Sequence, residues 1–476
     1  MSGHFNISTI WTRWQKPAPT LPHHLPRLLL ADRFQPKYVR RCQTTQTVAA
    51  LLRRLDWEQL PTTLQCQRTG WRTVPLAAYV GAYLVKLEQN LNSFGKLRAY
   101  LRQHPALVWA LGFPLVTAAG QSHGFDVEAS LPSQRYFSSR LSTLPNDVLQ
   151  PLLGEQVHWL QARLGDPFGQ VVSIDTKHIL AWVKENNPKA YIKDGRFNKT
   201  QQPKGDPDCK VGCKRRKNQA TPTKEGQPVS EKVSIGEFYW GYASGVVATK
   251  VEEVGEFVLA ELTQTFDNGD LTYFLPLMNQ VEQRLGFRPP FGTADAAFDA
   301  FYVFDYFYNA GAGGFAAVPR RESKTVRTFD ADGTPLCEAG LPFALRGKFT
   351  NRTSRVQHQR ARFVCPLLHP EPSGETCPIA HAKWPSGGCK LTMPTAAGAR
   401  IRHQLDREGQ PYKAVYKQRT AVERIFSQAV ALGIERPKLR NATAIANINT
   451  LTYLLINLRA MARLDALPVV KEQTDR

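Results

Sequence analysis

The first third of the chain carries apolar residues at helical spacing. Between residues 41 and 165 they recur every three or four positions, the period of helices that bury one face. The clearest segments are residues 47–60, 75–91, 95–113 and 130–165. We therefore predict a helical domain over residues 41–165. Residues 1–40 are rich in Pro, His and Arg and predict a flexible basic arm.

From residue 166 the pattern alternates between short β-branched or apolar runs and helical segments. Strands are expected at residues 171–183, 238–252, 291–296 and 313–321, and helices at 272–287 and 297–311. Such alternation is typical of an α/β fold, with a mixed sheet flanked by helices. The first part of this core covers residues 166–319 and contains a basic loop over 184–232.

The alternation of strands and helices stops after residue 319. Residues 320–411 hold much Pro and Gly with short β-like runs, and they predict a β- and loop-rich insertion. Residues 412–465 then predict a pair of closing helices. The last of these is long and apolar, but Asn447, Asn457 and Arg459 interrupt it, so we expect a buried packing helix and no membrane span.

The net positive charge of the chain indicates a polyanionic partner. The 61 Lys and Arg against 40 Asp and Glu give a formal net charge of +21, and a surplus of this size attracts a polyanion. The alternative is a generally basic protein without such a partner. The helices of 41–165 are candidates for binding a DNA duplex, or they simply pack against the core. No apolar signal segment opens the chain and the eight cysteines suit a reducing compartment, so we expect a cytoplasmic, nucleoid-associated protein with no membrane partner.

Three carboxylates stand out as candidate metal ligands. Asp175 follows the apolar run VVSI, Asp295 follows FGTA, and Glu423 lies in YKQRTAVERIF, a predicted helix. A buried Asp at a strand end is unfavourable unless it is paired or binds a metal. Mg²⁺ (or Mn²⁺) prefers such oxygen ligands and assists phosphodiester cleavage. Taken one at a time, each is more simply a turn, a helix cap or a salt-bridged side chain.

Together the motifs carry a family resemblance. HPALVWALGF with LPSQRYFSSRL, then SIDTK, then TADAAFDAFYVFDYFYNAGAGGFAAVPRR, and finally YKQRTAVERIF occur in this order over roughly residues 95–460. In these segments the chain resembles the DDE transposases of bacterial insertion sequences, of the cut-and-paste type. The resemblance implies an RNase H-like catalytic domain in which Asp175, Asp295 and Glu423 bind the metal ions. It also implies a dimer assembled across two DNA ends.

Several basic and aromatic residues are candidates for DNA contact. By the resemblance, Tyr416 and Arg419 would hold phosphates near the cleaved strand, and the Arg fork suits phosphate geometry. Strand alternation puts Lys177 on the same face as Asp175. The basic tract adds a run of four cations: Lys214, Arg215, Arg216 and Lys217. One departure from the family is Val430, where a Lys is frequent.

The insertion contains a weak zinc pattern. Thiol and imidazole groups recur at regular spacing, with Cys337 upstream: Cys365, His369, Cys377, His381 and Cys389. These are zinc ligands, and a metal would stabilise a loop-rich segment. Buried free thiols are the alternative.

We therefore expect a transposase that binds the terminal inverted repeats of a mobile element. It would cleave the DNA by metal-dependent phosphodiester hydrolysis and join the 3′-hydroxyl ends to target DNA. One alternative is an RNase H-like nuclease that cuts without joining. Another is a catalytically inactive, transposase-derived DNA-binding protein.

Overall fold

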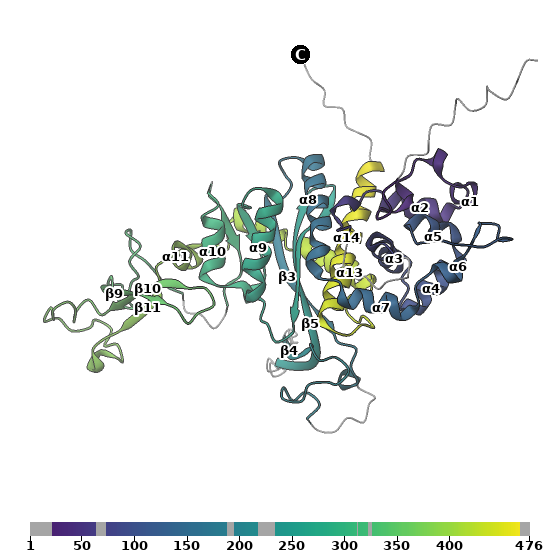
Figure 1. The fold of residues 1–476 in the computed structure, drawn as a ribbon. Coiled ribbons are helices and arrows are strands. Elements are labelled where there is room, and N and C mark those ends of the chain that lie inside the picture. The colour runs from purple at the N-terminus through teal and green to yellow at the C-terminus, as the bar shows by residue number, and fades with distance from the viewer. Residues whose placement is uncertain are drawn as a thin grey trace, which may run out of the picture. The chain divides into compact units, whose positions relative to one another are not determined.

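The computed structural model describes residues 21–62, 73–187, 195–217, 234–311, 313–321 and 326–466. The chain divides into two compact units, residues 1–155 and 156–476. Helix α8 (Gln150–Leu164) contains the boundary between them. Figure 1 shows the helices and strands of both units.

The first unit is helical, as its apolar spacing predicts. Its helices are α1 (Lys37–Arg40), α2 (Gln43–Leu52), α3 (Leu76–Glu88), α4 (Phe94–Gln103), α5 (Pro105–Leu111), α6 (Val127–Ser130) and α7 (Gln134–Thr143), with a small hairpin of β1 (Val116–Thr117) and β2 (Phe125–Asp126). Edge-to-face aromatic contacts form part of the core, and the Tyr83 hydroxyl donates to the carbonyl oxygen of Phe137 at 2.8 Å.

The expected loose arm does not extend through residues 21–40. This stretch forms short helical turns, and Arg27 donates to the carbonyl oxygens of Trp109 and Phe113 at 3.1 and 3.0 Å. These bonds satisfy carbonyls at the end of α5, where Gly112 takes a left-handed conformation. Residues 1–20 lie outside the described part of the chain.

The second unit is built on a mixed sheet. Its six strands in the described residues are β3 (Val171–Leu180), β4 (Lys210–Lys217), β5 (Ser234–Val251), β6 (Gly255–Thr265), β7 (Phe291–Thr293) and β8 (Phe315–Ala317). The order runs β4, β5, β3, β7, β8, and β6 also pairs with β5. Strand β5 pairs antiparallel with β3, β4 and β6. Strand β7 pairs parallel with β3 and β8. The expectation of a mixed α/β sheet is confirmed.

Helices cover both faces of this sheet (Figure 1). They are α9 (Leu271–Leu285), α10 (Phe301–Tyr308), α12 (Gln410–Lys417), α13 (Thr420–Ala431) and α14 (Ala442–Ala466). Neighbouring residues of β5 show the two layers: Ser244 bonds the Tyr453 hydroxyl of α14, while Gly245 lies against Tyr273 of α9. Burial on both faces explains why the centre of β5 is a continuous apolar run.

The polar interruptions of α14 have a structural purpose at the edge of the sheet. Asn457 accepts a hydrogen bond from the Val258 N–H and donates one to the Val258 carbonyl oxygen, both at 2.9 Å. A β-bulge at this point of β6 leaves backbone groups that the ladder alone does not serve. The prediction of a buried packing helix is confirmed. No helix in the described ranges is both long enough and apolar enough to cross a membrane.

The segment 320–411 is largely strand and loop, as predicted. A three-stranded antiparallel sheet is formed by β9 (Ala344–Asn351), β10 (His358–Val364) and β11 (Lys390–Pro394), in the order β11, β10, β9. One helix was not predicted: α11 (Ala397–Gln404), which packs closely on α10. The contact is tight because a Cβ on Gly398 would lie 2.3 Å from the Phe301 carbonyl oxygen.

Two local predictions are wrong. The basic tract 184–232 is not loop throughout, because β4 occupies Lys210–Lys217 and pairs with the first half of β5. The motif YKQRTAVERIF is not one helix either. Helix α12 ends at Lys417 and α13 begins at Thr420, with Arg419 at the junction.

Replacing Gly241 by Ala is expected to destabilise the second unit by about 3 kcal/mol. An added Cβ would lie 2.0 Å from the carbonyl oxygen of Ile179 on the neighbouring strand. Urea unfolding followed by circular dichroism should show the lower midpoint. The control Gly347→Ala lies on β9, where an added Cβ meets nothing within 4 Å, and should change little. An unchanged midpoint for Gly241→Ala would contradict this close pairing of β3 with β5.

Candidate active site on two parallel strands

The register of β3 and β7 brings Asp175 and Asp295 together. The parallel ladder pairs Val171 with Phe291 and Ser173 with Thr293. Carried two residues further, the same offset places Asp175 level with Asp295, on the same face of the sheet. Their electrostatic coupling agrees, because the charge of Asp295 raises the pKa of Asp175. Two carboxyl groups separated by 119 residues of sequence thus meet where the end of β7 lies beside the middle of β3.

Each aspartate is held by a backbone amide beside it. The Thr176 N–H donates to Asp175 Oδ1 at 2.7 Å, and the Ala297 N–H donates to Asp295 Oδ1 at 2.8 Å. Asp295 is also the N-cap of a short 3₁₀ turn over Ala296–Phe298, so the capping interpretation of this residue is correct as far as it goes. One oxygen of each carboxyl group is therefore fixed, which limits the rotation of the other.

Arg419 connects these aspartates with Glu423. Its guanidinium lies 2.6 Å from Glu423 Oε1 and 3.8 Å from Asp175 Oδ2. The pairing with Glu423 is an i,i+4 contact at the start of α13, which survives the break between α12 and α13. The positive charge of Arg419 also acts on Asp295, where it opposes a net rise in the pKa. One guanidinium thus contacts Asp175 and Glu423 and acts electrostatically on Asp295.

The two aspartates are partly removed from water, so their ionised forms are stabilised by nearby positive charge. Burial raises the pKa of Asp175 to about 7, from an ordinary value of 3.8; the charge of Asp295 adds to the rise, and the charge of Arg419 opposes it. The pKa of Asp295 is raised as well, first by burial and then by the nearby charge of Asp270. Removing these carboxyl groups from water disfavours their ionised forms, which a bound cation would favour.

Asp270 is an acidic neighbour that the sequence analysis missed. It precedes helix α9, and its Oδ1 accepts a hydrogen bond from the Thr176 hydroxyl at 2.6 Å. Its charge raises the pKa of both Asp175 and Asp295. In sequence it is one of several acids in a turn before a helix, and only its position beside β3 separates it from a capping residue.

The donor set suits a hard divalent cation. Asp175, Asp295 and Glu423 offer carboxylate oxygens, which Mg²⁺ and Mn²⁺ prefer, and two of them are buried enough to disfavour ionisation without a cation. Within the described ranges no three His, Cys, Asp or Glu side chains already stand in the arrangement of a metal site. In this cluster Arg419 supplies the positive charge instead.

The other predicted DNA contacts have varied environments. Lys177 points to Glu435, with Nζ 3.5 Å from Oε1, and Tyr416 stacks on Tyr412 with ring centroids 5.8 Å apart. His178 packs against Phe266, as a core residue would. The four cations 214–217 lie on β4, but their side chains are outside the described part of the structure.

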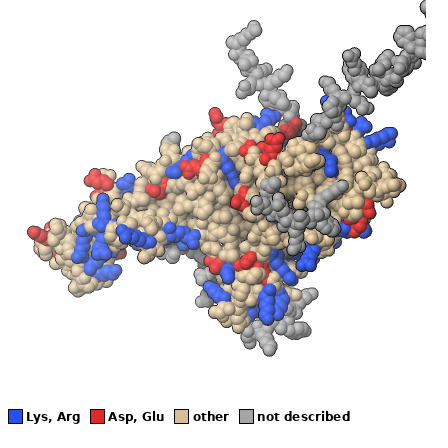
Figure 2. All heavy atoms as spheres, in the orientation of Figure 1, with Lys and Arg blue, Asp and Glu red and all other residues tan. Residues whose placement is uncertain are grey.

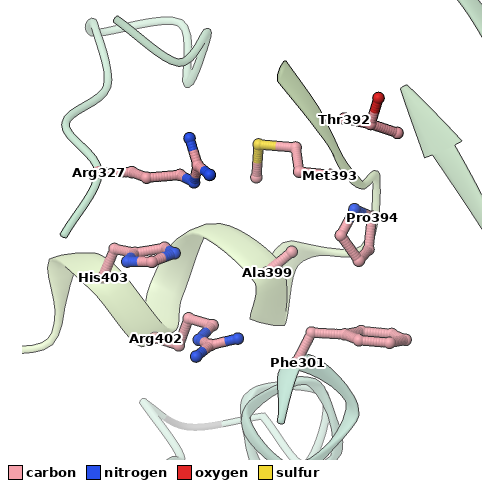
Figure 3. A pocket seen from close by; sticks show the side chains of 8 residues that line it. All are labelled: Phe301, Arg327, Thr392, Met393, Pro394, Ala399, Arg402 and His403. Atoms are coloured by element: carbon pink, nitrogen blue, oxygen red, sulfur yellow. The ribbon is translucent and has the colours of Figure 1, made fainter. Parts of the chain in front are cut away.

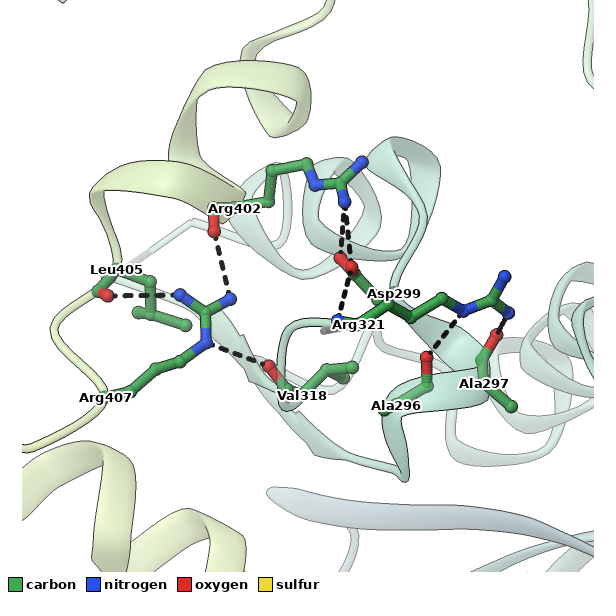
Figure 4. A network of polar contacts seen from close by, with 8 residues as sticks. All are labelled: Ala296, Ala297, Asp299, Val318, Arg321, Arg402, Leu405 and Arg407. Carbon is green, nitrogen blue, oxygen red and sulfur yellow. Dashed lines mark hydrogen bonds and ion pairs between the residues drawn. The ribbon is translucent and has the colours of Figure 1, made fainter. Parts of the chain in front are cut away.

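Asp299 is a buried acid close in sequence to Asp295. Its side chain is fully buried and forms a 2.8 Å ion pair with Arg402 of α11. It also accepts the Arg321 N–H at 3.0 Å, while the Arg321 side chain donates to the carbonyl oxygens of Ala296 and Ala297 (Figure 4). This network fixes the turn that follows Asp295 and ties it to the insertion.

The thiols of the insertion meet in a different set from the one predicted. The antiparallel register of β10 and β11 pairs Val364 with Lys390, so Cys365 and Cys389 face each other one residue further on. Cys337 lies close enough to raise the pKa of Cys389, although burial and Cys365 contribute more. His381 lies 3.9 Å from Glu338 instead. Zinc binding stays a prediction, and in the described residues these thiols are not already arranged as a metal site.

The raised pKa of Asp175 predicts a pH-dependent stability in a chelating buffer. The folded protein holds this proton more tightly than the unfolded chain, so the contribution is complete below about pH 4 and is lost as the pH rises to about 7. Asp175→Asn stays uncharged and should exceed the wild type by about 2–4 kcal/mol at pH 8, with a much smaller difference at pH 4.5. Urea midpoints measure this difference, and the exposed Glu371→Gln serves as control. A gap between Asp175→Asn and the wild type that is equal at both pH values would refute the assignment.

Comparison with known proteins leaves the family of this chain open. No family model matches it, and no curated protein matches it either.

Proposed function

We propose that this protein is a DDE transposase. It binds the terminal inverted repeats of a mobile element, cleaves the DNA by Mg²⁺- or Mn²⁺-dependent hydrolysis, and joins the 3′-hydroxyl ends to target DNA. The observation that carries the proposal is the parallel register that aligns Asp175 with Asp295, with Arg419 linking them to Glu423. The ordered motifs that resemble this family support the same reading.

The chain's own residues give the site its chemistry. Asp175, Asp295 and Glu423 would hold the cation, which when bound activates a water or 3′-hydroxyl and stabilises the leaving oxygen. The backbone N–H groups of Thr176 and Ala297 orient the aspartates. Arg419 is paired with carboxylates here, and its planar fork suits a phosphate equally well, so it can serve the DNA once the carboxylates have another cation.

A basic hairpin offers a surface for the DNA backbone. Residues 344–364, which form β9 and β10, contain six Lys and Arg and no Asp or Glu. Figure 2 shows Lys and Arg gathered over this small sheet. Several of these side chains are exposed, namely those of Arg346, Lys348, Arg352, Arg355 and Arg362. Phosphate neutralisation by such a surface is independent of base sequence and weakens steeply with salt.

Further parts of the proposal follow from the family resemblance. The mixed sheet with helices on both faces is compatible with an RNase H-like fold. Assembly as a dimer on two DNA ends, and action on nucleoid DNA in the cytoplasm, belong to the same proposal. A nuclease without strand transfer would use the same cluster, so joining must be tested apart from cleavage.

Neutral replacement of each carboxylate is expected to abolish catalysis. Asp175→Asn, Asp295→Asn and Glu423→Gln should each lower Mg²⁺-dependent cleavage by at least about a hundredfold. The reason is that loss of a direct metal ligand reduces activity more than loss of a residue that only hydrogen-bonds to a ligand. The substrate is a plasmid carrying this gene with its flanking DNA. Cleaved and joined products are measured separately on gels and by sequencing of junctions.

The controls separate the competing functions. Glu371→Gln removes an exposed acid of the insertion and should leave cleavage unchanged. DNA binding should persist in the three carboxylate variants, which shows that they are folded. Cleavage without joining of pre-cut ends would favour the nuclease, and DNA binding without any cleavage by the wild type would favour the inactive DNA-binding protein.

A further inference from the structure

A cavity of about 290 Å³ lies between α10, α11 and β11 (Figure 3). Its volume is close to the lower end of the range for small-molecule sites. Its polar wall is formed by Arg327, Arg402 and His403. Its apolar wall includes Phe301 and Met393, and none of its lining residues is acidic. The cavity therefore combines positive charge with an apolar surface.

The positive charge of the cavity is only partly balanced. Asp299 pairs with Arg402 but is already shared with the Arg321 N–H. No ion pair in the described residues involves Arg327, and burial together with the charge of Arg402 lowers the pKa of Arg327. Two guanidinium groups thus face one cavity with a single carboxylate behind them.

Buried nitrogen atoms at the cavity also lack partners. Within the described part of the chain, His403 Nδ1 and Arg402 Nε are buried and form no hydrogen bond. Burial, followed by the charges of Arg402 and Arg327, lowers the pKa of His403 to about 4. At neutral pH His403 is therefore an uncharged imidazole with one N–H to donate. Buried polar groups without partners are unfavourable, and an anion would supply the missing acceptor.

The floor of the cavity is rigid. Helices α10 and α11 cross at Gly398, whose N–H donates to Asp305 Oδ1 at 3.1 Å. The space for a Cβ at Gly398 is already filled by backbone atoms of α10. Arg402 is fixed by its 2.8 Å pair with Asp299. A ligand would meet preorganised groups, which lowers the entropy lost on binding.

We propose that this cavity binds a phosphate group of a DNA strand. The Arg327 guanidinium and the His403 imidazole would donate to its oxygens, and Arg402 would add fixed positive charge. The apolar wall, with the Phe301 ring, would take the attached sugar or base. The identity of the phosphate as part of DNA rests on the proposed function, whereas the recognition of a phosphate does not.

Calorimetric titration of the full chain tests this with four probes: thymidine 5′-phosphate, inorganic phosphate, thymidine and acetate. We expect thymidine 5′-phosphate to bind more tightly than inorganic phosphate, and the other two not to bind. Arg327→Gln should weaken binding of thymidine 5′-phosphate by about tenfold or more, and Arg327→Lys by less, because it retains the charge. The matched control Arg163→Gln removes an exposed charge from α8 and should have no effect.

Four results would overturn the inference. They are absence of thymidine 5′-phosphate binding, unchanged affinity in Arg327→Gln, an equal loss in Arg163→Gln, and equally tight binding of acetate. Inorganic phosphate binding as tightly as thymidine 5′-phosphate would overturn the assignment to DNA and leave a site for free phosphate.

Failure of the inference can be told from failure of the proposed function. Asp175→Asn should lose cleavage and keep thymidine 5′-phosphate binding. Cleavage by the wild type without thymidine 5′-phosphate binding would refute the phosphate site and leave the proposed function supported. Arg327-dependent binding without any cleavage would refute the proposed function and leave the phosphate site supported.

Discussion

The parallel pairing of β3 with β7 is the constraint on which the rest of this site depends. Side chains of a strand are fixed in direction by the pleat, so one register decides whether two distant aspartates meet or miss. Here β3 is held on its other side by a long antiparallel ladder with β5. Gly292 lets α10 lie close on β7, because a Cβ there would overlap the ring of Phe307. The pair Asp175 and Asp295 is thus positioned by backbone hydrogen bonds and packing.

Charge is arranged in opposite ways in two parts of the second unit. Around Asp175, buried carboxyl groups outnumber the guanidinium that serves them, and the pKa of Asp175 is raised accordingly. Around Arg327, guanidinium groups outnumber the carboxylate, and pKa values of the basic groups are lowered. One region has the character of a cation site and the other that of an anion site. The proposed reaction between a metal-activated oxygen and a phosphate would use both kinds of environment.

The insertion is physically joined to the turn that carries Asp295. Arg321 holds the carbonyl oxygens of Ala296 and Ala297, and Asp299 binds both Arg321 and Arg402 of α11. A movement of α11 would therefore strain the residues that directly follow Asp295. This gives the insertion a mechanical connection to the carboxylate cluster, in addition to the exposed basic hairpin of β9 and β10 that it contributes.

Sequence alone determined most of the elements of this protein and its candidate site residues, because periodicity and residue type are local properties. It identified the strands around Asp175 and Asp295, the helical first unit, the β-rich insertion and the three carboxylates. Tertiary structure decided which residues distant in sequence come into contact. The place of Asp270 near Asp175, the burial of Asp299 and the meeting of Cys365 with Cys389 all depend on strand register or helix crossing, which a linear pattern does not contain. Even the break between α12 and α13 escaped the local pattern, since helical propensity continues through Arg419.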